Sequence, residues 1–143
     1  MRPTLLFKRL VELAKIPTYA HDTDSGMDIY SCESVTIPKF FRKTISTGIA
    51  AVIPDGYELQ VRPKSGLAKN AGVVASFGTV DNGYRGEICV TLFNHSPNDF
   101  EVKSGDKIAQ LVLSKVRNAL TFEIAEIDTG TVRGTGGFGS TGR

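Results

Sequence analysis

The segment from Gly78 to Glu87 is the part of the sequence best suited to chemistry, because it places a carboxylate and an aromatic ring around an Asn82-Gly83 pair. Asn-Gly is a strong hairpin signal, since both central residues of a type I′ turn need positive φ. Such a turn would display Asp81 and Tyr84 side by side. A carboxylate there can act as a general base toward water, and an aromatic ring can pack against a sugar. A solvent-exposed hairpin without a catalytic role is the alternative.

A second segment, Arg62 to Leu67, is predicted to end a strand and begin a short helix. We expect Ser65 to cap this helix. Free backbone N–H groups with Arg62 and Lys64 nearby would suit an anion such as phosphate. Ordinary capping without a ligand is the alternative.

The C-terminal segment, Arg133 to Arg143, is rich in glycine, so we expect it to be mobile without a ligand. Its internal arginine, its phenylalanine and the hydroxyls of Ser140 and Thr141 are groups that a bound ligand could order. The phosphate-binding pattern GxxxxGK[ST] is absent from it. A disordered terminus is the alternative.

Other candidate sites lack their usual partners. His21 and His95 do not belong to an H-x-E plus C-x-x-C set, so zinc-dependent deamination is unsupported. The acidic residues between Asp22 and Asp28 lack the closing glutamate of an EF-hand loop. Cys32 and Cys89 have no metal-site or redox-motif spacing, and we expect them to be free thiols.

The elements that must position these residues are short strands. With 143 residues, 41% of them hydrophobic, the chain predicts one globular domain. Tyr57, Leu59 and Val61 alternate with polar residues, the period of a half-buried strand. The runs with strand character are Val35 to Ile37, Lys43 to Ile53, Tyr57 to Arg62, Glu87 to Phe93, Ile108 to Leu113 and Leu120 to Ile127.

Turn-forming residues separate these runs, a pattern typical of a β-sandwich or barrel. Helical apolar spacing occurs only in Leu5 to Lys15 and in Ser65 to Asn70. The net charge of +2 is too small to predict a nucleic-acid polymer as the main partner. No apolar run approaches the roughly 20 residues of a membrane span, so we expect a cytoplasmic protein with no membrane association.

Taken in order, the segments resemble the five motifs of the trimeric dUTPase family. The motifs correspond to Ala20 to Ile29, Arg62 to Ala68, Gly78 to Glu87, Gly105 to Leu111 and Arg133 to Gly142. One such motif alone would be weak evidence, whereas five in this order and spacing are specific.

The resemblance implies an all-β, jelly-roll-like β-barrel (β-clip) with one short helix after motif two, assembled as a homotrimer. It divides the chain into a barrel domain, residues 1–127, and a flexible tail, residues 128–143, that closes over a neighbouring subunit's site. It also implies that Leu5 to Lys15 is largely extended, so the helical interpretation there is withdrawn.

The implied activity is hydrolysis of dUTP to dUMP and pyrophosphate with Mg²⁺, which limits uracil incorporation into DNA and supplies dUMP for thymidylate synthesis. Asp81 would activate the water that attacks the α-phosphorus, and Asp28 would reach Mg²⁺ through water molecules. The residues implied to contact uracil and deoxyribose are Ala75, Gly78, Thr79, Val80, Asp81, Tyr84, Cys89 and Phe138. The residues implied to hold the phosphates are Lys64, Ser65, Gly66, Gln110, Arg133, Gly139, Ser140 and Thr141.

Two residues depart from the family pattern. Lys64 stands where motif two usually has arginine, which keeps the charge but loses the two-pronged guanidinium geometry. Ala75 stands where many relatives have asparagine, so a side-chain contact near the uracil is lost. Two alternatives stay open: a relative of the same fold that deaminates dCTP, and a regulatory protein that senses dUTP.

Overall fold

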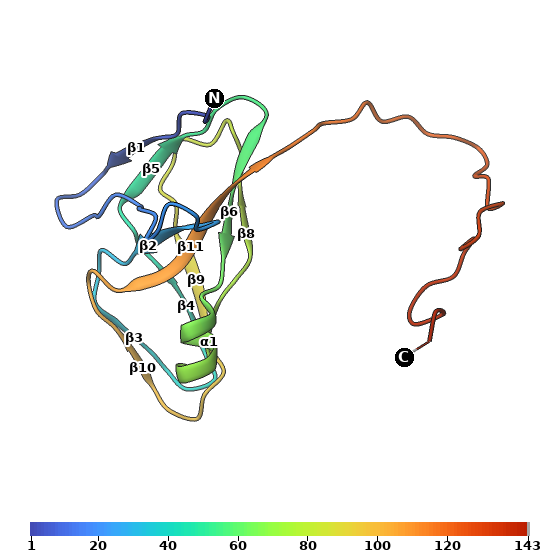
Figure 1. Cartoon of the computed structure of the whole chain (residues 1–143). Helices are drawn as coiled ribbons and strands as arrows, with labels where there is room; N and C mark the ends of the chain where they lie inside the picture. The colour runs from blue at the N-terminus through green and yellow to red at the C-terminus, as the bar shows by residue number, and fades with distance from the viewer. Residues whose placement is uncertain (143) are drawn as a thin grey trace.

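The computed structural model describes residues 1–142, and nearly all of its regular structure is antiparallel β-sheet (Figure 1). One short helix, α1, accompanies the strands and spans Ser65–Ala71. The strands are β1 (Leu6–Arg9), β2 (Met27–Tyr30), β3 (Val35–Ile37), β4 (Arg42–Ile45), β5 (Ile49–Val52), β6 (Tyr57–Arg62), β7 (Val73–Ala75), β8 (Gly78–Val80), β9 (Val90–Asn94), β10 (Phe100–Val102) and β11 (Lys107–Lys115).

Four small sheets share one hydrophobic core. Their strand orders are β1-β5, β3-β10, β2-β11-β6-β8 and β4-β9-β7. Isoleucine, leucine and valine side chains from the other three sheets meet in a single buried cluster, to which the β1-β5 sheet adds Ala51 and the partly buried Phe7. A mostly β domain with one helix after motif two was the prediction, and the structure confirms it.

Strand β6 follows the predicted alternation, with Leu59 and Val61 buried and the intervening Gln60 and Arg62 only partly so. Its partner β11 has a register irregularity between Lys107 and Ala109 where it pairs with β2. Such bulges re-aim side chains and are common beside active sites.

The helix was predicted at the right place but with the wrong cap. Lys64 is the N-cap residue, with extended backbone angles, and no side chain caps the helix; Ser65 is already its first residue. Gly72 ends the helix in the left-handed conformation, with φ of 66°, which glycine adopts without strain.

Three sequence predictions about strands were wrong. The run from Lys43 to Ile53 is divided into β4 and β5 around Gly48, whose φ is 65°. The run from Glu87 contributes a strand only from Val90 onward. The run from Leu120 to Ile127 forms no strand in the single chain.

The N-terminal segment confirms the withdrawal of the helix. Residues 6–9 form β1, which pairs with β5, and a turn follows in which the Ala14 N–H donates to the Val11 carbonyl. The C-terminal residues leave the body after β11 and run outward in a long arm (Figure 1).

Candidate active site

The first candidate site is a polar cavity of about 520 Å³ where the ends of β2, β11 and α1 meet. Asp28 of β2 and Gln110 of β11 are direct cross-strand partners, and Gln110 also pairs with Arg62 of β6. The Gln110 amide donates to the Pro63 carbonyl over 3.1 Å. The cavity is lined by Ala20, His21, Asp24, Ser25, Gly26, Asp28, Lys64, Ser65, Gly66, Lys107 and Gln110.

Gly26 is a spatial requirement of this cavity. A Cβ atom at Gly26 would lie 2.6 Å from Oε1 of Gln110, so a larger residue there would displace the amide. The structure thus explains why a glycine precedes Met27 and Asp28 in motif one.

The electrostatics of the cavity centre on Asp28. Its carboxylate is almost fully buried and is paired with the Lys64 ammonium at 2.5 Å and the Lys107 ammonium at 2.8 Å. Burial raises the pKa of Asp28, but the hydrogen bonds and charges of Lys107 and Lys64 outweigh it and hold that pKa below its ordinary value. The cavity lining carries the two ammonium groups of Lys64 and Lys107 and the two carboxylates of Asp28 and Asp24, so its formal charges balance.

A second cavity, of about 340 Å³, lies between β6, β8 and the segment that follows β8. It is lined by Val61, Gly78, Thr79, Val80, Asp81, Tyr84, Glu87, Ile88 and Cys89. A Cβ atom at Gly78 would lie 3.3 Å from the Val61 side chain, so glycine keeps this wall close to β6.

The turn that carries Asp81 differs from the predicted hairpin. The Tyr84 N–H donates to the Asp81 carbonyl over 3.0 Å, which closes a turn at the expected place. Asn82 and Gly83 do not have positive φ, so the turn is not type I′. Strand β8 pairs with β6, and no strand returns directly after the turn. The side chain of Asn82 instead anchors the turn by donating to the Ile53 carbonyl over 2.6 Å.

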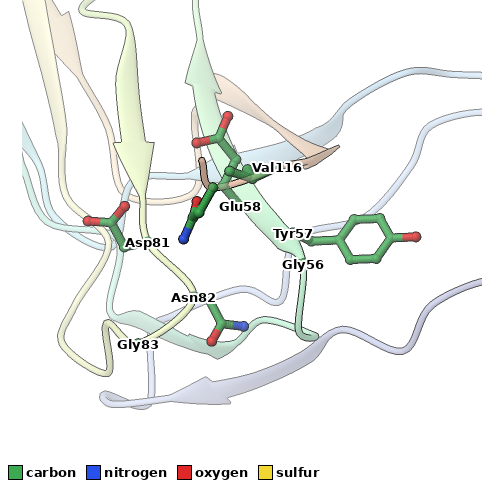
Figure 2. Close-up of a pocket in the computed structure, with 8 residues that line it drawn as sticks. Gly56, Tyr57, Glu58, Asp81, Asn82, Gly83 and Val116 are labelled. Carbon is green, nitrogen blue, oxygen red and sulfur yellow. The ribbon is translucent and has the colours of Figure 1, made fainter. Parts of the chain in front are cut away.

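Asp81 also lines a third cavity, of about 480 Å³, on the other side of the turn. Figure 2 shows the carboxylates of Asp81 and Glu58 in this region, while the Tyr57 ring points away from Asp81. Val116 and Asn118, the first residues of the outgoing arm, complete the lining. Asp81 is therefore reached from two sides, and its side chain is exposed.

Tyr84 is fixed in place beside Asp81. Its hydroxyl donates to the Glu87 carbonyl over 2.9 Å, and its ring lies against Gly86. The Glu87 carboxylate accepts hydrogen bonds from the Ser46 hydroxyl and the Gly48 N–H, and mainly the Ser46 bond lowers the pKa of Glu87. Burial, assisted by the Glu87 charge, raises the pKa of the Cys89 thiol to about 11. Both cysteines are free, as predicted.

Several predicted site residues lie outside these cavities. Ala75 is buried in β7, where it pairs with Leu92, and it does not line the second cavity. Arg133, Phe138, Gly139, Ser140 and Thr141 lie on the arm, where the recorded hydrogen bonds of residues 128–142 are all internal to that segment. Phe138 is fully exposed and has a φ of 48°.

Sequence reasoning missed Lys107 and Glu87 as site residues, although both lie within the motifs it identified. In the sequence, each is one charged residue within a short motif, like many others in the chain. Its role becomes visible only when the folded structure shows which distant residue it contacts. Asp28 is that partner for Lys107, and the turn at Ser46 is that partner for Glu87.

Among residues 1–142 there is no group of three or more histidine, cysteine, aspartate or glutamate side chains that could hold a metal ion. A helix long and apolar enough to cross a membrane is likewise absent from this part of the chain.

Comparison with known proteins gives consistent matches over almost the whole chain. Residues 12–142 match the family model described as dUTPase. A deoxyuridine 5'-triphosphate nucleotidohydrolase from Picosynechococcus sp. is 50% identical over 139 residues, which cover 94% of this chain and 97% of that protein.

Solved structures agree. The Staphylococcus bacteriophage 80alpha dUTPase with dUPNHPP superimposes with a TM-score of 0.93 at 27% identity, covering 99% of this chain and 100% of that one. A mutant dUTPase from phage phi11 of S. aureus, described as revealing the coordination of a structural Mg(II) ion, gives a TM-score of 0.83 at 26% identity, covering 88% of this chain and 99% of that one.

Proposed function

This chain belongs to the dUTPase family and hydrolyses dUTP to dUMP and pyrophosphate, and we propose that it does so at sites shared between the subunits of a homotrimer. The observation that carries the proposal is that one chain places the candidate residues in two different cavities. The cavity that contains Asp81 and Tyr84 and the cavity that contains Asp28 and Lys64 have no lining residue in common.

The outgoing arm supports assembly. Leu120, Phe122 and Ile124 alternate along it and are 87%, 83% and 65% exposed. Each such side chain contributes about 1.5–3 kcal/mol when it is fully buried. A neighbouring copy that received the arm would cover all three, and closed symmetry would repeat that contact around a threefold axis.

In the assembled site, the second cavity receives uracil and deoxyribose. Backbone groups from Gly78 to Asp81 and at Cys89 read the uracil edge, and the Tyr84 ring packs beneath the sugar, where it leaves no room for a 2′-hydroxyl. A ligand that leaves buried polar groups unpaired is rejected strongly, which disfavours cytosine. Ala75 is buried in the core and does not line this cavity, so in this proposal it supports the fold rather than touching the base.

The triphosphate occupies the first cavity of a neighbouring subunit. Lys64, Gln110, Ser65 and the Gly66 N–H hold it there, and the ammonium groups of Lys64 and Lys107 attract its negative charge.

Asp81 is the general base. Its carboxylate takes a proton from a water molecule, the water oxygen bonds to the α-phosphorus, and the bond from that phosphorus to the bridging oxygen breaks. The electron pair of that bond leaves with pyrophosphate. General-base assistance of this kind contributes about 10²–10⁴-fold to a rate.

The donor set fits Mg²⁺ in one limited way. Within the described part of the chain, only two carboxylates, Asp28 and Asp24, line the phosphate cavity, which suits an ion held mainly by phosphate oxygens and water. Lys64 and Lys107 occupy both oxygens of Asp28, and phosphates entering the cavity would attract these ammonium groups and release the carboxylate. Bound Mg²⁺ neutralises charge that develops on the leaving group.

The tail acts as a lid. Phe138 stacks over the uracil, and Arg133, Gly139, Ser140 and Thr141 complete the phosphate contacts when the tail of a third subunit closes. Closure excludes water and completes the site. The free thiols of Cys32 and Cys89 suit a reducing compartment such as the cytoplasm.

A nucleotide panel tests the proposal. Pyrophosphate release is measured with dUTP, UTP, dCTP and dTTP, each with Mg²⁺ and with EDTA. We expect rapid release only from dUTP with Mg²⁺. Equal turnover of dUTP and UTP would contradict the assigned role of Tyr84, and full activity in EDTA would contradict the role of Mg²⁺.

A further inference from the structure

The position of the Tyr84 ring depends on the two residues that follow it closely in the chain. A Cβ atom at Gly86 would lie 2.4 Å from the Tyr84 hydroxyl oxygen and 2.6 Å from the carbon that bears it. The hydroxyl is held by the Glu87 carbonyl over 2.9 Å. The ring therefore rests on Gly86 and is fastened at its far end to the main chain of Glu87.

Glu87 is fastened in turn to a different part of the fold. Its Oε1 atom accepts from the Ser46 hydroxyl and from the Gly48 N–H, the latter at 2.7 Å. The next residue is tied to the start of β5, directly after that turn, since the Ile88 N–H donates to the Ile49 carbonyl over 2.8 Å. The segment that carries Asp81 and Tyr84 is thus clamped to the turn between β4 and β5.

A carboxylate suits this clamp better than an amide does. The groups that meet Oε1 of Glu87 are donors, a hydroxyl and a backbone N–H. A carboxylate offers acceptors only, whereas an amide would turn its NH₂ group toward donors in one of its two orientations. Hydrogen bonds to charged groups are also stronger than bonds between neutral groups.

We propose that Glu87 is a positioning residue for sugar discrimination: by anchoring its own main chain to the Ser46–Gly48 turn, it fixes the Tyr84 ring at the height that excludes a 2′-hydroxyl. This inference rests on the proposed place of Tyr84 beneath the deoxyribose. Glu87 touches neither the reacting phosphorus nor the attacking water in this account.

The test is the ratio of kcat/KM for dUTP to kcat/KM for UTP. We expect Glu87→Gln to lower this ratio about tenfold, the effect of losing one charge-assisted hydrogen bond. The dUTP loss should lie mainly in KM, because Asp81 is unchanged. Gly86→Ala, which pushes the ring from below, should lower the ratio in the same direction.

Glu33→Gln is the matched control. The Glu33 carboxylate accepts from the Ser46 N–H over 2.8 Å, so it holds the same turn without contacting the segment of Tyr84. Its ratio should equal that of the wild type. Ser46→Ala removes one of the two donors to Glu87 and leaves the backbone N–H of Gly48 in place. It should lower the ratio by a smaller factor, and it replaces Glu87→Gln as the test if that variant does not fold.

The outcomes distinguish a failure of the proposed role of Tyr84 from a failure of the proposed role of Glu87. If Tyr84→Ala leaves the ratio intact, the proposed role of Tyr84 is itself wrong. If Tyr84→Ala lowers the ratio but Glu87→Gln and Ser46→Ala do not, the role of Glu87 is overturned while that of Tyr84 stands. An equal fall in Glu33→Gln would also overturn it, because any loosening of the turn would then suffice.

Discussion

The Asp28 carboxylate and the Lys64 ammonium, 36 residues apart in the sequence, lie 2.5 Å apart in the lining of the polar cavity between β2, β11 and α1. Asp28 comes from a buried strand and Lys64 from the residue that begins the helix. This ion pair holds the Lys64 ammonium in the cavity before a nucleotide binds. The Lys64 ammonium is therefore held by the Asp28 carboxylate, the same group that the proposed mechanism places near Mg²⁺.

The first prediction concerns acid. Because the pKa of Asp28 is lower in the folded protein than its ordinary value of 3.8, its ion pairs stabilise the fold above that value. This contribution disappears as the pH falls through the lower, folded-state pKa. In urea denaturation, Asp28→Asn should be less stable than the wild type at pH 6, and the difference should shrink below about pH 4. A difference that grows on acidification would contradict the ion-pair geometry.

The second prediction concerns the general base. Asp81→Asn should lower kcat at least 100-fold and leave nucleotide affinity largely intact, because the amide keeps the shape of the carboxylate. Single-turnover assays and calorimetry with a non-hydrolysable dUTP analogue measure the two quantities. Glu58→Gln, which changes the other carboxylate near Asp81, is the control and should retain activity. Unchanged turnover in Asp81→Asn would remove this residue from its role.

The third prediction concerns the tail. Ending the chain at Val132 removes residues whose recorded hydrogen bonds are internal to the tail, so the melting temperature should not change. The value of kcat/KM for dUTP should fall by about 100-fold, the usual effect of losing a positioning element. A truncated protein with full activity would show that the tail is not a lid.

The fourth prediction concerns the arm. Phe122→Glu places a charge where the proposed trimer buries an aromatic ring that is 83% exposed in the single chain. Light scattering should then report a smaller species than for the wild type. Glu123→Gln, the next residue along the arm and of opposite phase, should keep the wild-type mass. Equal masses for both variants would mean that this stretch does not mediate assembly.

Local sequence patterns predicted those strands and helices in which the spacing of apolar residues matches the residues that the fold buries. Strand β6 was predicted to the residue, because its alternation matches a surface that is buried on one face. The helix after it was also predicted, but its cap was not, since no side chain supplies one. Short strands such as β7 and β8 carry three residues each, too few to show a period.

The wrong predictions have physical causes that lie outside the local sequence. Leu120 to Ile127 has the alternation of a strand, but a strand needs a partner, and this chain alone provides none there. Asn82-Gly83 favours a two-residue hairpin, yet β8 finds its partner in β6, and the Asn82 side chain is used to anchor the turn. The motifs predicted most residues of the candidate site. The ion pair of Lys107 with Asp28 and the hydrogen bonds of Glu87 to the Ser46–Gly48 turn were not predicted, because their partners are distant in the sequence.

The most direct test of shared sites is complementation between two inactive chains. Asp81→Asn with an intact tail and the chain ending at Val132 with an intact Asp81 are co-expressed with different tags, and the mixed oligomer is purified and assayed with dUTP. Each mixed trimer should restore roughly a third of the wild-type rate, since one of its three sites combines an intact Asp81 from one subunit with an intact tail from another. Activity no greater than that of the two parents would mean that one chain builds each site alone.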